Sequence, residues 1–135
     1  MNTILLVIAS VFVFVAAAIH LLFFFYESVL WSKPATWKRF GIASQEHADI
    51  VRPMAFNQGF YNVFLALGAG IGLVLIGTGT FFQAGVGIAA FSLLSMLLAA
   101  VVLITSNPKL ARAALIQGLA PLLGILFFAL ALVVK

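Results

Sequence analysis

Four long apolar runs follow one another along the chain, separated by short polar segments. They cover Ile4 to Leu30, Met54 to Ile76, Gln83 to Thr105 and Ala113 to Val134. Each run is long enough to cross the hydrocarbon core of a bilayer, which takes about 20 helical residues. The first is about 40 Å long at 1.5 Å per residue, so we expect it to tilt or to protrude. The pattern predicts an all-α, polytopic membrane protein whose residues 1–135 form a single four-helix transmembrane domain.

The composition agrees with this pattern and leaves no room for a soluble domain. The chain has 135 residues, 65% of them hydrophobic and 7% charged, and its mean hydropathy is +1.27. An average soluble domain has about 25% charged residues. There are no cysteines, which excludes disulfides, thiolate chemistry and cysteine-based metal sites and leaves the redox compartment open.

The net charge of +4 is concentrated in two of the three loops. The basic residues of the first and third loops are Lys33, Lys38, Arg39, Arg52, Lys109 and Arg112, whereas the middle loop, residues 77–82, has no charge. The positive-inside rule therefore predicts that both basic loops are cytoplasmic and both termini lie outside, in the cell (inner or plasma) membrane. We expect the bilayer as a partner and no nucleic acid, which would need basic residues clustered on one solvated face.

The first loop contains the sequence WSKPATWKRFG, which predicts a short helix. Ser32 is a candidate cap, Pro34 suits the first turn, and Gly41 is a stop signal. Because Trp31 and Trp37 stand among basic residues, we expect an amphipathic helix lying on the lipid headgroups. A second short turn is expected from Ser44.

Two ionisable residues, His20 and Glu27, fall within the first apolar run. Such groups are costly in a bilayer and are candidates for a functional site. The seven positions between them amount to roughly 700° of helical rotation, close to two full turns, so they share a face with Phe24 and Trp31. They are about 10 Å apart along the axis, and each therefore needs a partner from another helix.

The second apolar run begins with the polar sequence FNQGFYN. Taking Asn57 as zero, Tyr61 lies near about 40°, Gln58 near about 100° and Asn62 near about 140°, which predicts one polar sector. Further along, the Gly68 to Gly72 spacing is a small-xxx-small pair that allows close helix approach. The sequence leaves open whether this pair serves packing within the bundle or dimerisation.

The fourth run adds Gln117, whose backbone carbonyl loses its helical hydrogen bond because Pro121 has no N–H. The third run has little polarity: Ser92 and Ser95 are interpreted as interhelical glue, and Gly85 and Ala89 as packing positions. The first, second and fourth runs are therefore predicted to converge on a cytoplasm-facing polar pocket that the third supports.

Several motifs together resemble a known family. IHLLFFFYESVLW, the FG of the first loop, NQGFYNVFLALG and QGLAPLLG resemble the small four-helix bacterial and fungal membrane proteins grouped as domain of unknown function 1304. The resemblance implies a four-helix fold and membrane residence and supplies no activity. Its pattern residues here are His20, Glu27, Trp31, Asn57, Gln58, Gly59, Tyr61, Asn62, Gln117 and Gly118.

The leading functional hypothesis is a pocket that binds or transports a small solute. Glu27 would carry the charge and favour a cationic or amine ligand, and His20 would be a deeper hydrogen-bonding or proton-relay group. The predicted ligand-binding residues are His20, Glu27, Trp31, Asn57, Gln58, Tyr61, Asn62 and Gln117. Because four helices are few for a complete transporter, this hypothesis favours a homodimer.

Two alternatives remain open. The polar residues could be interhelical glue, with each hydrogen bond worth about 0.6 to 2 kcal/mol in a bilayer. Alternatively, His20, Glu27 and Tyr61 could be acid and base groups of an isomerase or hydratase acting on a lipid-like substrate. The sequence favours the non-enzymatic hypotheses, since nothing defines a nucleophile, an oxyanion hole or a cofactor motif. One histidine and one carboxylate two turns apart are a poor metal-ligand set, so neither metal nor cofactor is expected.

Overall fold

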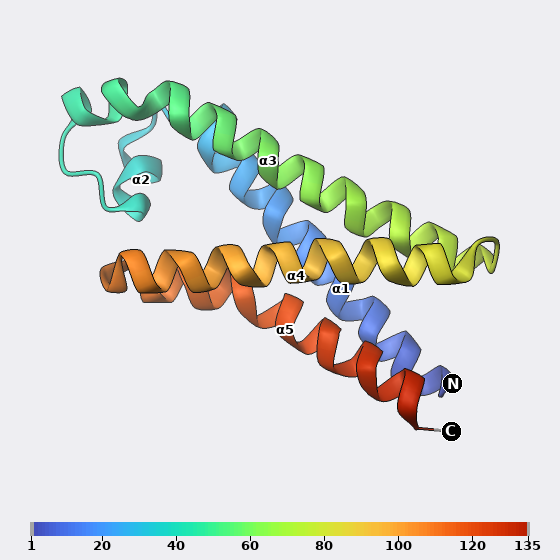
Figure 1. Ribbon diagram of the computed structural model, residues 1–135. Helices are drawn as coiled ribbons and strands as arrows, with labels where there is room; N and C mark the ends of the chain where they lie inside the picture. The colour runs from blue at the N-terminus through green and yellow to red at the C-terminus, as the bar shows by residue number, and fades with distance from the viewer. Residues whose placement is uncertain (1, 135) are drawn as a thin grey trace.

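The computed structural model describes residues 2–134 of the chain (Figure 1). Its α-helices are α1 (Thr3–Phe24), α2 (Pro34–Trp37), α3 (Gln45–Thr78), α4 (Phe82–Ser106) and α5 (Ala111–Val133). A π-helical turn, η1 (Phe25–Val29), extends α1, and the 3-10 turns η2 (Lys38–Phe40) and η3 (Pro108–Leu110) follow α2 and precede α5. Within the described residues, four helical segments are long and apolar enough to cross a membrane. The predicted all-α, four-span architecture is confirmed.

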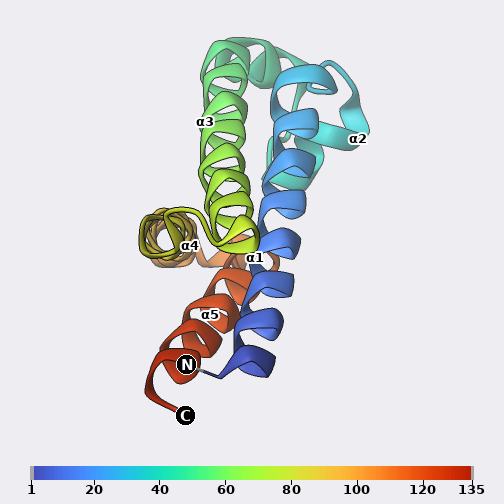
Figure 2. The same ribbon diagram turned by 90° about the vertical axis from the view of Figure 1, so that its right-hand side faces the viewer.

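The four long helices form a ring in which each packs against two neighbours. The packed pairs are α1 with α3, α3 with α4, α4 with α5, and α5 with α1; Figure 2 shows α1 beside α3 at one end and beside α5 at the other. The start of α1 and the end of α5 lie at the same end of the bundle (Figure 1), where the Asn2 N–H donates to the Ala131 carbonyl at 2.9 Å. The first loop and the α4 to α5 turn lie together at the opposite end.

The centre of the bundle is built largely from small side chains, while large apolar ones face outward. Buried alanines occur on all four long helices, including Ala16, Ala69, Ala89 and Ala120. Outward positions carry residues such as Phe91, which is 71% exposed. Lipid provides no hydrophobic driving force between helices, so association depends on the close packing that small residues allow.

The backbones of α3 and α4 approach closely at Gly72. A Cβ added there would lie 2.8 Å from the Gly85 carbonyl oxygen and from the Ala89 backbone nitrogen. A Cβ at Gly68 would meet the Ser92 hydroxyl. The small-xxx-small pair is therefore used for packing inside the bundle, which answers the question that the sequence left open.

The start of α3 differs from the sequence-based boundary. The helix begins at Gln45 and runs through Pro53, whereas the apolar pattern predicted a start at Met54. Ser44 is its N-cap, and its side-chain oxygen accepts a hydrogen bond from the His47 N–H at 3.2 Å. The short turn expected from Ser44 is therefore the first turn of α3, and the prediction of a separate element is wrong.

The short helix predicted in the first loop is confirmed as α2, but the aromatic residues of the loop lie elsewhere than predicted. Trp31 and Trp37 pack against Ala48 on the extension of α3, and the indole N–H of Trp31 donates to the Ala48 carbonyl at 2.9 Å. The aromatic face of the loop is thus covered by protein and does not lie on headgroups. The residue before the short helix is Lys33 and makes no side-chain cap, so the Ser32 assignment is wrong. Gly41 ends the segment with φ +77° in the left-handed region, as expected of a glycine stop.

We expect Gly72→Ala to lower the free energy of unfolding by about 1–3 kcal/mol, because the added methyl group has to push α3 away from the α4 backbone. The matched control is Gly70→Ala, where nothing lies within 4 Å of the added Cβ. That change should be neutral or stabilising by up to about 1 kcal/mol, since alanine is the better helix former. Equilibrium unfolding in detergent measures both, and equal effects would contradict the packing role of Gly72.

Candidate functional site

Glu27 is carried by the π-helical turn at the end of the first span. The Leu30 N–H donates to the Phe25 carbonyl at 2.8 Å, a bond that spans five residues and changes the phase of the helix. In this turn the Ser28 hydroxyl donates to the Phe56 carbonyl of α3 at 2.8 Å. A Cβ at Gly59 would collide with the Ser28 hydroxyl, so Gly59 provides the space for this approach.

The buried carboxylate of Glu27 is bound by the side chain of Asn62. The Asn62 Nδ2 donates to Glu27 Oε2 at 2.7 Å and to the Gln58 carbonyl at 3.2 Å. Glu27 and Asn62 are each 8% exposed. A polar group at this depth is stabilised only when it is hydrogen-bonded, so this bond ties α1 and α3 together where the polar sequence begins.

Glu27 also contributes to the wall of a cavity of about 410 Å³, here called the polar cavity. Its lining combines a carboxylate, two amides, a hydroxyl and a guanidinium with apolar side chains. The residues are Phe23, Glu27, Arg39, Phe40, Gln58, Ala99, Val102, Leu103, Ser106, Leu110, Ala113 and Gln117. Glu27, Gln58 and Gln117 therefore face one space from three different spans, as the predicted convergence required.

The third span contributes more than the sequence indicated. The α4 residues Val102, Leu103 and Ser106 lie on the wall of the polar cavity, so the prediction that this span only supports the site is wrong. The hydroxyls of Ser92 and Ser95 donate to the carbonyls of Ile88 and Phe91 on their own helix, so the prediction that these serines join helices by hydrogen bonds is wrong.

The polar sector predicted for α3 is divided between two faces. The buried face of α3 carries Gly59, Asn62 and Ala66, whereas Asn57 is exposed and Tyr61 is 52% exposed. Two residues correspond to about 200° of helical rotation, which directs Asn57 away from Gly59. Asn57 and Tyr61 therefore lie outside the polar cavity.

His20 and Trp31 are buried in two other environments. His20 is 1% exposed in the helical core, and its Nδ1 is 2.9 Å from the Ala16 carbonyl oxygen. Because a carbonyl oxygen only accepts, Nδ1 is the donor of this bond. Trp31 belongs to the aromatic cluster of the first loop. Neither residue lines the polar cavity, although His20 shares with Glu27 the inward face of the first span, as predicted.

Arg39 is the site residue that sequence reasoning missed. It was assigned to membrane topology together with the other basic loop residues, whereas the structure places it on the wall of the polar cavity. Its guanidinium lies 5.4 Å from the centre of the Tyr26 ring. The aromatic residues near Arg39 in the sequence could have indicated that its side chain packs inside the protein, since arginine packs readily on aromatic faces.

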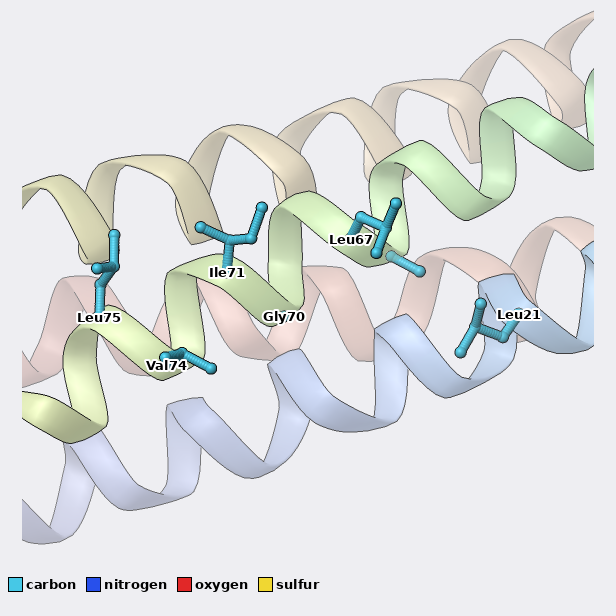
Figure 3. A pocket seen from close by; sticks show the side chains of 7 residues that line it. Leu21, Leu67, Gly70, Ile71, Val74 and Leu75 are labelled. Atoms are coloured by element: carbon cyan, nitrogen blue, oxygen red, sulfur yellow. The ribbon is translucent and has the colours of Figure 1, made fainter.

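A separate groove of about 440 Å³ runs between α1 and α3. Figure 3 shows Leu21 on α1 and Leu67, Ile71, Val74 and Leu75 on α3 along it. The described residues that line it are all apolar, so it offers no group for acid, base or polar recognition chemistry.

Within residues 2–134, no group of three histidine, aspartate or glutamate side chains lies close enough together to hold a metal ion.

A family model described as protein of unknown function (DUF1304) matches residues 14–129. The chain belongs to this family. The match confirms the resemblance seen in the sequence motifs, and it includes every residue that lines the polar cavity. No curated protein and no solved structure matches the chain. For this DUF1304 protein, functional inference therefore rests on the geometry of the site.

The hydrogen bond between Glu27 and Asn62 can be measured by a double-mutant cycle. We expect Glu27→Leu and Asn62→Leu to be coupled by about 0.6–2 kcal/mol, because either single change leaves the other polar group buried without its partner. The readout is the free energy of unfolding in detergent or bicelles. Asn57→Leu combined with Glu27→Leu is the control, since Asn57 is exposed, and strictly additive Glu27 and Asn62 effects would contradict the assignment.

Proposed function

We propose that the polar cavity binds a small organic amine and that the protein carries it across the membrane. The observation that supports this proposal is the convergence of Glu27, Gln58 and Gln117 on one cavity. Its volume of about 410 Å³ lies in the range of small-molecule sites, about 300–1,000 Å³. Interhelical glue alone requires no shared space between these three side chains.

The composition of the wall indicates the solute. Glu27 provides a negative charge for an amine, and the amides of Gln58 and Gln117 can donate or accept hydrogen bonds. Phe23 and Val102 offer apolar surface to a hydrocarbon body. With Arg39 also on the wall, a solute that carries a hydrogen-bond acceptor in addition to its amine satisfies more of the lining groups.

The proposal can be tested with phenyltrimethylammonium, a permanently charged cation with an apolar ring that cannot cross a bilayer as a neutral amine. We expect proteoliposomes to bind and accumulate it, and Glu27→Gln to reduce binding by about tenfold or more, because the variant removes the negative charge that attracts the cation in a site of low dielectric constant. Glu46→Gln, an exposed acid on the first turn of α3, is the matched control and should behave as wild type. Unchanged binding and uptake in Glu27→Gln would refute the role of Glu27.

We further propose that the protein resides in the cell membrane with both basic loops in the cytoplasm, so that the polar cavity opens to that side. This is supported by the common location of Arg39, Lys109 and Arg112 near one end of the bundle, around a single hollow, together with the positive-inside rule.

Because the chain has no cysteine, single-cysteine variants can test this orientation. A membrane-impermeant maleimide should label Thr80→Cys in intact cells and Ser32→Cys only after the membrane is permeabilised. Both positions are exposed in loops at opposite ends of the bundle. The reverse labelling pattern would show that the basic loops face outward.

The proposed transporter is a homodimer, because four spans offer few helices for alternating access. Gly68 and Gly72 are occupied by contacts with α4, so the second copy has to dock on another surface.

The alternative of interhelical glue is favoured by one observation, the bond between Asn62 and Glu27 at 2.7 Å. If this is the whole role of the cluster, Glu27→Gln should alter folding without any loss of ligand binding.

The enzyme hypothesis loses its geometric basis, since His20, Glu27 and Tyr61 do not surround a common space. Tyr61 faces outward, and His20 is hydrogen-bonded within its own helix.

A further inference from the structure

A second cavity, of about 490 Å³, lies at the same end of the bundle between α1 and α5. We call it the basic cavity, because three cationic side chains occur on its wall together with a tyrosine and apolar residues. The lining residues are Ile19, Leu22, Phe23, Tyr26, Arg39, Phe40, Lys109, Leu110, Arg112, Ala113 and Ile116. The family match and the proposed amine site assign no role to it.

The charge of the basic cavity has one sign. Arg39 comes from the first loop, whereas Lys109 and Arg112 come from the start of the last span, about 70 residues later in the chain. None of the described lining residues is acidic. The macrodipole of α5, which starts at Ala111 without a side-chain cap, adds positive potential at this end. Folding thus brings like charges together around a hollow, an arrangement that an anion stabilises.

The remainder of the wall is apolar and reaches the lipid-facing surface. Leu22 on α1 and Ile116 on α5 are each 48% exposed, and they line the cavity from opposite sides together with Ile19 and Phe23. A soluble anion would gain nothing from such a wall. An amphiphile gains from both parts, because its charged head meets the cations while its hydrocarbon chain stays among apolar side chains.

We propose that the basic cavity holds an anionic phospholipid of the surrounding bilayer. Its phosphate contacts Arg39, Lys109 and Arg112, and one acyl chain lies between Leu22 and Ile116. Arginine and lysine are the residues that bind phosphate oxygens most effectively, and basic pockets between transmembrane helices on one side of a bilayer suit anionic headgroups. Tyr26 stacks below the Arg39 guanidinium and holds it in position for this contact.

Native mass spectrometry of the full-length protein, released from a non-ionic detergent and titrated with phosphatidylglycerol or with the uncharged lipid diacylglycerol, tests the proposal. We expect wild type to retain phosphatidylglycerol preferentially. The triple variant Arg39→Gln, Lys109→Gln, Arg112→Gln should lose about tenfold or more in affinity for it, as expected for the loss of charge-assisted hydrogen bonds. The matched control is Lys33→Gln, Lys38→Gln, Arg52→Gln, which removes three charges from the same end at residues outside the cavity wall.

The control triple should retain the wild-type preference. Equal losses in the two triples would overturn the proposal, because they would indicate attraction by net charge alone. A second variant, Ile116→Phe, keeps every charge and fills the apolar part of the cavity, so it should also weaken phosphatidylglycerol retention. Displacement of the lipid by an equal concentration of soluble glycerol phosphate would overturn the lipid assignment and indicate a site for free phosphate esters. None of these measurements uses an amine, so their outcome is independent of the amine site.

Discussion

A carboxyl group inside the hydrocarbon region has to be hydrogen-bonded by another part of the protein, and Glu27 meets this constraint through Asn62. The bond fixes how α1 and α3 are rotated against each other. One residue later, the Ser28 hydroxyl reaches the Phe56 carbonyl, and Gly59 leaves the space for it. The rotation that satisfies Glu27 directs Asn62 inward and therefore directs Asn57 and Tyr61 outward.

The fold could be predicted from the sequence because a bilayer permits few solutions. A chain that crosses lipid must satisfy its backbone internally, so a long apolar run of this composition is a helix. Outside the hydrocarbon this constraint is absent, and there the prediction failed. Residues 45–53 are polar enough to form a loop, yet they extend α3 because Ala48 provides the surface on which Trp31 and Trp37 are buried.

The site could be predicted only in part, since helical periodicity groups residues by face without showing which face is buried. For the first span the shared face of His20 and Glu27 was predicted correctly, and in the structure it is buried together with Ala9, Val13 and Ala16. On α3 the amides span about 140°, and either edge of that sector could have faced inward. The small residues Gly59, Ala66 and Ala69 share the face of Asn62. Their spacing in the sequence is the signal that would have indicated the buried edge of the sector.

Two neighbouring cavities share Phe23, Arg39, Phe40, Leu110 and Ala113 on their walls, and their charges distinguish what each can hold. The wall of the polar cavity includes both an acidic residue, Glu27, and a basic one, Arg39. The basic cavity has Lys109 and Arg112 beside Arg39 and no acidic lining residue among those described. Arg39 therefore shares the wall of the polar cavity with an acidic residue, whereas in the basic cavity it lies only among other cationic residues. Because Arg39 lines both cavities, its guanidinium is available to an anion in the basic cavity and to a hydrogen-bond acceptor of a solute in the polar cavity.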